Sequence, residues 1–521
     1  MRPFFTPFHL PTLMSSQSLL RHLVSAGLLV SGGIFLGRLT GFLREVAVAS
    51  KFGVSQEADV ILFSLTLPDF LINLLMGGAM AAALIPEFKR STPNISDKLF
   101  LQATFWAGFG FSSLVVLLAW NADYLVQLFA PGFDSLAVKL TIDLLTLVLW
   151  LMPLTALAGV TMSYLQSKGH FAIPALGTFI FNSTLIIALF FFVTDAGHLR
   201  VLGGTVIIGG FLRWASQLIS MRTHGMQWKY PDNWLISKDL LWRYFQALAA
   251  GSLLLLLPVI ARALASLAGA GSFASLNYAI KLIELPMGIC LGVLASVLFP
   301  KLSEFFAQDR LEEGKQLAVD GVLWVFIMAY SVVLVFACFG QPLTRLAFQW
   351  GTMTAEGIQD IALLVAVGIT ALPAQGILLL MTALANAKRD TKLPFYCSVV
   401  GIIVFIPLAG YLFPLKGLKG IMMALVVAYW SILASQIILL QQRHQLSLIN
   451  LPMLMEMSKV LVTGFLVLLP FIWVAQSVQV PPIGSLGLAV VAGLLMLAGG
   501  FLVIKRYRDY ISHRLGLRTH A

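Results

Sequence analysis

Long apolar stretches alternate with short polar stretches along the whole 521-residue chain. The hydrocarbon core of a bilayer is about 30 Å thick and is crossed by about 20 apolar residues of helix. The apolar stretches have this length, so the pattern predicts an all-α polytopic membrane protein. Fourteen transmembrane segments are predicted, over residues 22–44, 60–85, 99–120, 138–164, 172–194, 201–220, 244–267, 273–298, 317–340, 359–384, 393–413, 418–441, 456–476 and 484–504.

The composition agrees with this pattern. Hydrophobic residues make up 59% of the chain and charged residues 11%, whereas a soluble domain carries roughly 25% charged residues. Cys290, Cys338 and Cys397 all lie inside apolar segments, which excludes a disulfide framework and a cysteine-based zinc site. The net charge of +11 is expected to mark cytoplasmic loops rather than a nucleic-acid-binding surface.

Lysines and arginines predict the orientation, because they are enriched in the cytoplasmic loops of membrane proteins. If the N-terminus is cytoplasmic, most of the loop cations fall on the cytoplasmic side, among them Lys89, Arg90, Lys388 and Arg443. We therefore expect a multi-pass protein with both termini in the cytoplasm.

A short motif occurs twice. The sequence GAMAAALIPEF (78–88) ends the second segment, and GVLASVLFPKL (292–302) ends the eighth. Six segments separate the copies, so both have the same orientation, as in transporters that rock two halves around a central site. The predicted organisation is a cytoplasmic N-terminal segment (1–21), an N-lobe (22–220), a cytoplasmic linker (221–243), a C-lobe (244–441), two additional helices (442–504) and a basic cytoplasmic tail (505–521).

The first segment ends in GRLTGFLREVAVASKFG (37–53), which places charges where hydrocarbon is expected. A charge at the bilayer centre costs about 2.5 kcal/mol or more, so Arg38 is predicted to face an aqueous cavity together with Glu45, which shares its helix face. Arg44 either faces the same cavity or extends to the outer headgroups. Gly41 either lets a ligand or backbone approach closely or simply allows helix packing.

The second segment carries two acids. Asp69 lies near mid-depth and needs a partner or a proton, and Arg38 on the neighbouring helix is the expected partner. Asp59 lies at the outer end of the segment, where it is either a cavity acid or an interfacial acid. Pro68 lacks a backbone donor and is expected to kink the helix so that it lines the cavity.

The eighth segment contains SLNYAIKLIELPMGIC, in which Lys281 and Glu284 are three residues apart and form an ion pair on one helix face. Pro286 follows directly and is expected to bend this helix as well. The pair is either a self-neutralised structural pair or a source of a cation that meets an anion. Arg262 in the seventh segment adds a further charge.

Four cations therefore lie on helices beside the repeat axis, which predicts a cavity for a lipid with a diphosphate head and an isoprenoid tail. They are Arg38, Arg44, Arg262 and Lys281. The sequence has no P-loop, no HExxH motif and no serine hydrolase motif at a strand–helix junction. We expect no enzyme activity, no cofactor and no metal site. The energy source is then the membrane potential, an ion gradient or substrate supply.

Three stretches, GRLTGFLREVAVASKFG, AGSFASLNYAIKLIELPMGI and ALANAKRDTKLPF, resemble the MurJ/MviN family of lipid II flippases. The resemblance covers essentially the whole chain. It implies a V-shaped alternating-access carrier, acting as a monomer in the bacterial inner membrane, for undecaprenyl-diphosphate-linked peptidoglycan precursor. Such a carrier serves cell wall biogenesis and cell shape, and cell-wall synthesis proteins are then its expected partners.

The resemblance also implies roles for single residues. Arg38 and Arg44 match the essential arginines of the family's first helix, and Asp59 matches the acid at the start of the second helix. Lys281 stands where the family usually has arginine, and Glu284 matches the nearby acid. The last two helices help to form a groove for the lipid tail in that family.

The chain departs from the family pattern at two places. After the Leu-Pro pair it has Asp69 and Asn73, whereas the family typically has asparagine and a pair of arginines. Ala261 stands where many members have an aspartate linked to sodium binding, although Asn386 and Asp390 are retained from the other half of that site. Coupling to sodium, to protons or to the membrane potential therefore stays open.

Three alternative functions are considered. A flippase for another polyprenyl-diphosphate glycan, of the O-antigen or exopolysaccharide type, would use the same cavity chemistry. A cation-coupled drug antiporter would need an acidic, aromatic cavity, whereas these charges are net basic. A scaffold that transports nothing would tolerate the loss of Arg38 and Lys281. The leading hypothesis is that Arg38, Arg44 and Lys281 hold the diphosphate, while Asp69 and Glu284 position and release those cations.

Overall fold

The structure, a computed structural model, describes residues 16–76, 78–193, 196–249, 253–388, 390–448, 450–477, 482–504 and 507. Every regular element within these residues is a helix. The first half of the chain forms α1 (Ser16–Phe52), α2 (Gln56–Met76), α3 (Ala79–Arg90), α4 (Pro93–Trp120), α5 (Ala122–Phe129), α6 (Ser135–Val148), α7 (Leu151–Ser167), α8 (Ala172–Phe191), η1 (Ala196–His198) and α9 (Leu199–Thr223). The second half forms α10 (Lys238–Ala249), η2 (Leu253–Leu255), α11 (Leu256–Ser266), α12 (Ser272–Ala307), α13 (Leu311–Phe348), α14 (Ala355–Gly368), η3 (Ile369–Ala371), α15 (Leu372–Ala387), α16 (Lys392–Lys416), α17 (Leu418–His444), α18 (Leu451–Ser477) and α19 (Pro482–Val503).

Eleven helical stretches among the described residues are long and apolar enough to cross a membrane. Helices satisfy their own backbone polar groups, which is what a spanning segment in lipid requires. The predicted all-α polytopic fold is confirmed. The predicted number of fourteen is not confirmed: the stretches in α1 and α12 are not among the eleven, and the apolar stretch Leu253–Ser266 is short.

The seventh predicted segment, 244–267, is not one helix. Its first part belongs to α10, which begins at Lys238 inside the predicted linker and packs against α3. Apolar and charged positions alternate at helical spacing in α10, and Tyr244 on it donates a hydrogen bond to the Leu75 carbonyl at 2.5 Å. The apolar part of the segment that follows is short, Leu253–Ser266.

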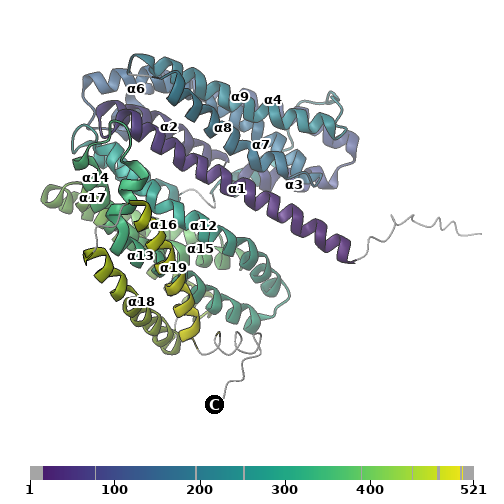
Figure 1. Cartoon of the computed structure of the whole chain (residues 1–521). Helices are drawn as coiled ribbons and strands as arrows, with labels where there is room; N and C mark the ends of the chain where they lie inside the picture. The colour runs from purple at the N-terminus through teal and green to yellow at the C-terminus, as the bar shows by residue number, and fades with distance from the viewer. Residues whose placement is uncertain are drawn as a thin grey trace, which may run out of the picture.

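Figure 1 shows two groups of helices that lie close together near α14 and separate toward the other end of the molecule. Helices α1–α9 form the N-lobe, in which α1 packs on α8 and α4 on α7. Helices α11–α17 form the C-lobe, in which α16 packs on α17 and α12 on α13. Contacts between the lobes are made by α1 and α2 with α12, and by α5 with α11.

The two lobes share an interruption that the motif repeat did not predict. The fourth segment breaks between α6 and α7, and the tenth breaks at η3 between α14 and α15. Pro153 and Pro373 lie in the first turn of the helix after each break, where the missing N–H is tolerated. The motif copies differ, because the first follows a break at Gly78 (φ 91°) and the second lies within the continuous α12.

Hydrogen bonds join the lobes where α1 ends and α12 begins. The carboxylate of Asp59 accepts hydrogen bonds from the backbone N–H groups of Gly271 and Ala274, each at 2.7 Å. The N–H of Thr352 donates to the Ser50 carbonyl at 2.9 Å. Asp59 of the N-lobe therefore caps the first turn of a C-lobe helix, a favourable place for an anion.

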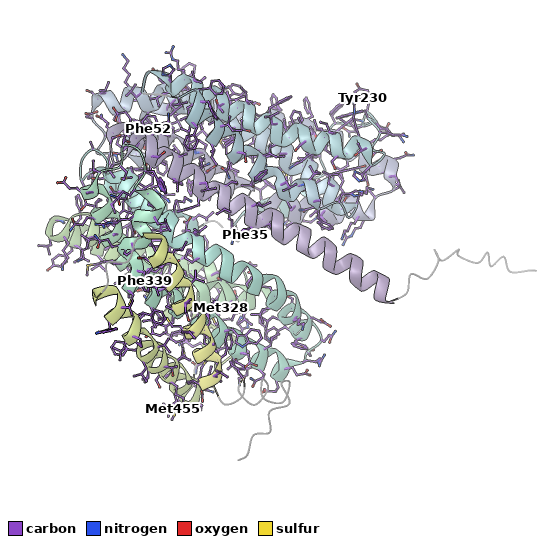
Figure 2. All side chains as sticks on the ribbon, in the orientation of Figure 1. Phe35, Phe52, Tyr230, Met328, Phe339 and Met455 are labelled. Carbon is purple, nitrogen blue, oxygen red and sulfur yellow. The ribbon has the colours of Figure 1, made fainter. Side chains whose placement is uncertain are left out.

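Aromatic rings fill the space behind these hydrogen bonds. The ring centroids of Tyr278 and Phe348 are 5.2 Å apart, and those of Phe42 and Phe348 are 5.7 Å apart. The hydroxyl of Tyr278 donates to the Gly53 carbonyl at 3.2 Å. We call this region, where Asp59 and Ser50 of the N-lobe meet the start of α12 and Thr352 of the C-lobe, the joint. Figure 2 shows Phe52 at the joint, far from Tyr230 at the opposite end of the N-lobe. The region between the end of α1 and the start of α12 is therefore packed like a protein core.

The last two helices lie outside both lobes, as predicted, and pack on α13. Gly464 of α18 faces Leu334 and Tyr330, and Gly500 of α19 faces Ile327, so small residues allow close helix contact. Large apolar side chains such as Leu466 remain exposed on this pair. The pair therefore presents an apolar surface that fits lipid.

A steric test of the joint uses Gly351. Its φ is 61°, and a Cβ there would lie 2.0 Å from the Ser50 carbonyl oxygen. We expect Gly351→Ala to lower the thermal unfolding midpoint of the purified protein more than Gly225→Ala does. Gly225 also has a positive φ (83°) but has no atom within 4 Å of a Cβ. Both variants bear the backbone strain of about 1–2 kcal/mol, so only the clash differs. Equal midpoints would contradict a tightly closed joint.

Candidate functional site

A chain of polar side chains crosses from the N-lobe to the C-lobe beside the joint. Arg44 NH2 lies 2.9 Å from Glu45 Oε1. The other carboxylate oxygen of Glu45 accepts a hydrogen bond from Asn277 Nδ2 at 3.0 Å, and Asn277 Oδ1 accepts one from Arg262 Nε at 3.0 Å. All four side chains are buried. Each charge is therefore paired or hydrogen-bonded, as burial in a low-dielectric interior requires.

Asn182 of α8 holds Arg44 from the other side. Its Oδ1 accepts a hydrogen bond from Arg44 NH1 at 3.3 Å, and its Nδ2 donates to the Gly37 carbonyl at 3.3 Å. A Cβ at Gly41 would lie 3.4 Å from Asn182 Nδ2, so glycine leaves room for this amide. Arg44 is thus fixed inside the protein and does not extend to the headgroups.

Asp69 pairs with a different arginine from the one expected. Its Oδ2 lies 3.8 Å from Arg44 NH2, and 41% of its side chain is exposed. Lys281 and Arg213 are also close enough to interact with it electrostatically. The predicted pairing of Asp69 with Arg38 is wrong, because Arg38 points to the C-lobe instead.

Arg38 crosses the space between the lobes. Its side chain is exposed, and NH1 donates a hydrogen bond to the backbone carbonyl of Gly288 on α12. A Cβ at Gly288 would clash with the guanidinium, so glycine gives the arginine room to lie against α12. Arg38 is therefore a cation whose only hydrogen-bond partner in the described part of the chain is one carbonyl oxygen.

Lys281 and Glu284 form the predicted ion pair, with Lys281 Nζ 2.9 Å from Glu284 Oε2. The exposed fractions of the two side chains are 32% and 46%. Arg262 also interacts electrostatically with Glu284. Helices α2 and α12 continue through Pro68 and Pro286, so neither proline ends its helix.

The exposure of these mid-helix charges indicates a wet space between the lobes. Arg38 comes from the N-lobe and Lys281 from the C-lobe, and both are open to solvent. Ionisable groups inside membrane helices face a bundle interior or a water-filled cavity. The cations in this region outnumber the carboxylates, so the arrangement can bind an anion between the lobes.

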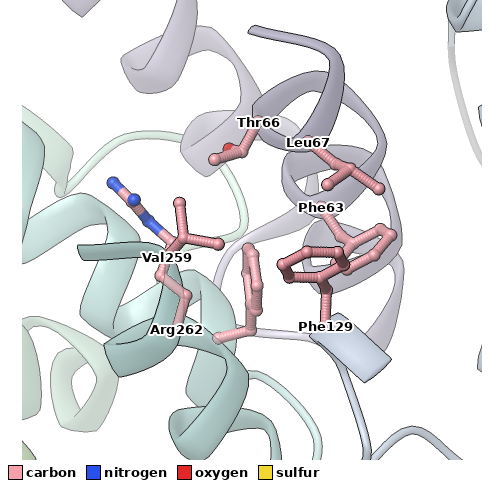
Figure 3. Close-up of a pocket in the computed structure, with 7 residues that line it drawn as sticks. Phe63, Thr66, Leu67, Phe129, Val259 and Arg262 are labelled. Carbon is pink, nitrogen blue, oxygen red and sulfur yellow. The ribbon is translucent and has the colours of Figure 1, made fainter. Parts of the chain in front are cut away.

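A small apolar pocket lies beside Arg262 at the joint. Figure 3 shows the guanidinium of Arg262 extending away from the rings of Phe63 and Phe129. The pocket is also lined by Leu67 and Phe273, so it takes residues from both lobes. Asp59 belongs to the joint as a helix cap, and its carboxylate does not belong to the polar chain of Arg44.

The predicted ion-site residues have other surroundings. Asp390 Oδ2 lies 3.1 Å from His444 Nε2 and 3.4 Å from Arg443 NH1, and its Oδ1 accepts from the Leu393 N–H at 3.2 Å. Burial raises the pKa of Asp390, but the hydrogen bonds from His444, Arg443 and Leu393 outweigh it and hold the pKa below its usual value. Asn386 is exposed at the end of α15. Asp390 thus caps α16 and binds α17.

Three polar residues near the site were not among the predicted site residues. Asn182 and Asn277 connect the buried charges, and Arg213 lies near Asp69. A single asparagine in an apolar segment is a signal that the sequence contains. Its partner cannot be identified until the helices are packed together.

Comparisons with known proteins agree with one another. A family model described as lipid II flippase MurJ matches residues 48–489. The lipid II flippase MurJ of Burkholderia cenocepacia is 28% identical over 435 residues, covering 78% of this chain and 81% of that protein. A probable lipid II flippase MurJ of Rhizobium tropici is 26% identical over 497 residues, with coverage of 91% and 92%.

Two solved structures share the fold. A lipid II flippase MurJ in an inward closed conformation has a TM-score of 0.78 at 21% identity, covering 93% of this chain and all of that chain. An inward-facing multidrug resistance MATE family transporter has a TM-score of 0.66 at 14% identity, with coverage of 79% and 94%. At these identities the likeness is one of fold.

The bridging role of Asn277 can be tested by Asn277→Ala. The change leaves Glu45 and Arg262 buried with one partner fewer each, and an unsatisfied buried group costs about 1–3 kcal/mol. We expect a lower thermal unfolding midpoint than in Ser275→Ala, which alters another buried polar residue of α12. An Asn277→Ala protein as stable as wild type would contradict the bridge.

Proposed function

This chain belongs to the MurJ family of lipid II flippases, and we propose that it moves lipid II from the cytoplasmic to the periplasmic leaflet of the inner membrane. The family model covers most of the chain, and relatives that match over most of their length are described as lipid II flippases. The observation that carries the proposal for the site is the pair of accessible cations, Arg38 and Lys281, on facing lobes.

In this proposal the diphosphate of the cargo binds between the lobes. Arg38 offers a planar guanidinium that can bind two phosphate oxygens, and Lys281 offers a point charge from the other lobe. Arg44 is held by Glu45 and Asn182, so it contributes a fixed positive field. Phosphate competes with the Gly288 carbonyl for Arg38 and with Glu284 for Lys281.

The geometry also suggests how the cargo crosses. The joint formed by Asp59 with α12 and by Ser50 with Thr352 closes one end of the space between the lobes. Alternating access requires this joint to open and the opposite end to close. Because Arg44 and Arg262 are linked through Glu45 and Asn277, an anion bound there acts on both lobes at once. Carrier motion and charge neutralisation are thereby coupled.

Orientation and energy source are parts of the same proposal. The basic loops favour cytoplasmic termini, and the joint then lies on the periplasmic side. We propose that the membrane potential, acting on the net positive cavity, drives transport, and that a sodium gradient does not. Ala261 is a buried apolar residue, and Asp390 is engaged by His444 and Arg443. The exposed apolar surface of α18 and α19 is proposed to hold the polyprenyl tail.

No observation favours a different cargo. The relatives reported above are described as lipid II flippases, and the likeness to MATE transporters is one of fold alone. The cavity is net basic, which disfavours a cationic drug as cargo. We propose that the chain acts as a monomer and works beside cell-wall synthesis proteins.

Complementation tests the cargo and the role of Arg38 together. Wild type is expected to rescue a bacterium depleted of its own lipid II flippase, and Arg38→Ala is expected to fail at equal membrane expression. Loss of a charge-assisted hydrogen bond weakens phosphate binding roughly 10- to 100-fold. Arg200→Ala is the control, because the Arg200 side chain is 81% exposed and its ion pair is with Asp143 of α6 rather than with a charge between the lobes, and it should rescue like wild type.

The outcomes separate the two parts of the proposal. Equal rescue by wild type and Arg38→Ala would contradict the role of Arg38 and keep the cargo. No rescue by a well-expressed wild type would contradict lipid II as the cargo.

A further inference from the structure

A further arginine, Arg213, lies in the N-lobe where α8 and α9 pack together. Arg213 and Gln217 are one helical turn apart on α9, and both pass over Gly177 of α8. A Cβ at Gly177 would lie 3.1 Å from Arg213 Nε and 3.3 Å from Gln217 Nε2. Glycine therefore opens the passage that both side chains occupy.

The polar atoms of this pair lack partners. Gln217 is completely buried, and among the described residues neither its Oε1 nor its Nε2 has a hydrogen-bond partner. The buried Nε of Arg213 lacks one as well. Buried polar groups are nearly always hydrogen-bonded, so three such atoms on two neighbouring side chains are not explained by packing.

The other cations of the region, unlike Arg213, each have at least one hydrogen-bond acceptor in the described part of the chain. Arg38 donates to a carbonyl, Arg44 and Arg262 are hydrogen-bonded inside the polar chain, and Lys281 pairs with Glu284. For Arg213 no protein acceptor within hydrogen-bond distance is found in the described part of the chain. Its electrostatic partner is Asp69, which also faces Arg44 and Lys281.

Arg213 thus brings a guanidinium toward the anion-binding space from a third helix. An arginine without a protein acceptor retains its full set of donors for a ligand. Arg213 Nε and the side-chain amide of Gln217 both lie beside Gly177. With the two ends of that amide exchanged, its oxygen turns toward Arg213 Nε and can accept its hydrogen, which would fix the plane of the guanidinium. Asp69 of α2 interacts electrostatically with Arg213, and its negative charge would repel an anion. The positive charge of Arg213 offsets that repulsion.

We propose that Arg213 binds an anionic group of the cargo, a phosphate or a carboxylate, and that Gln217 positions its guanidinium. This inference rests on the proposed function, because it takes the cargo head group as the anion. It makes Arg213 a binding residue of the N-lobe and Gln217 a positioning residue.

Binding to the full-length protein in nanodiscs tests the proposal, with lipid II, undecaprenyl diphosphate and undecaprenol as probes. Arg213→Gln is expected to bind lipid II roughly 10- to 100-fold more weakly than wild type, and Arg213→Lys to retain part of the affinity. Binding of the neutral undecaprenol should not change. An equal loss for both charged lipids assigns the phosphate, and a loss for lipid II alone assigns a carboxylate of the head group.

Two further variants distinguish positioning from folding. Gln217→Leu removes an unpartnered buried amide, so it should raise the thermal midpoint while weakening lipid II binding a few-fold. Gly177→Ala crowds both side chains and should weaken binding with all charges retained. Gly204→Ala on α9 is its control, since no atom lies within 4 Å of a Cβ there.

Two results would overturn the proposal. One is unchanged binding of both charged lipids by Arg213→Gln. The other is full recovery of binding when Asp69→Asn is added to Arg213→Gln, since Arg213 would then serve only as a counter-ion. A wild type that binds undecaprenyl diphosphate but not lipid II contradicts the proposed cargo, and Arg213→Gln still tests the subsite on that lipid.

Discussion

The pairing of Arg44 with Glu45 is the interaction on which the arrangement of this protein depends. Removing an ion from water costs several kcal/mol even after relaxation, so neither charge can be buried alone. Adjacent residues on one helix cannot complete all the hydrogen bonds of both groups. Asn182 of the N-lobe accepts a hydrogen bond from Arg44, and Asn277 of the C-lobe donates one to Glu45, so this ion pair links the two lobes through α1.

The same constraint separates structural charges from charges available to a ligand. The carboxylate of Asp59 is hydrogen-bonded to the first turn of α12, and that of Asp390 is bound by α16 and α17, so neither is available to a ligand. Arg38 and Lys281 remain accessible, because both lie in the space between the lobes, Arg38 against the backbone of α12 and Lys281 beside Glu284. A carrier needs both kinds, since the first closes one end of the path and the second attracts the cargo. Charge placement therefore sets both the joint and the binding space.

Sequence reasoning was most accurate where a signal is local. Apolar length predicted the spanning helices, and the spacing of Lys281 and Glu284 predicted their ion pair, because an i, i+3 contact needs only one helix. It failed for the seventh segment, in which apolar residues of α10 lie along α3 instead of continuing into α11. Hydropathy does not distinguish an amphipathic helix packed on a neighbour from the start of a spanning helix. The break before Pro153 was missed for a similar reason, since proline is also tolerated within membrane helices.

By itself the sequence determined the all-α membrane class, the repeated halves and the set of charges that had to be satisfied inside the bundle. Only the tertiary structure decided which charges meet. Asp69 lies beside Arg44 and not Arg38, and Arg213 approaches from α9 over Gly177. The physical reason is that a partner across two helices depends on helix rotation and depth, which the packing of all the helices sets. The spacing of residues along one chain fixes neither.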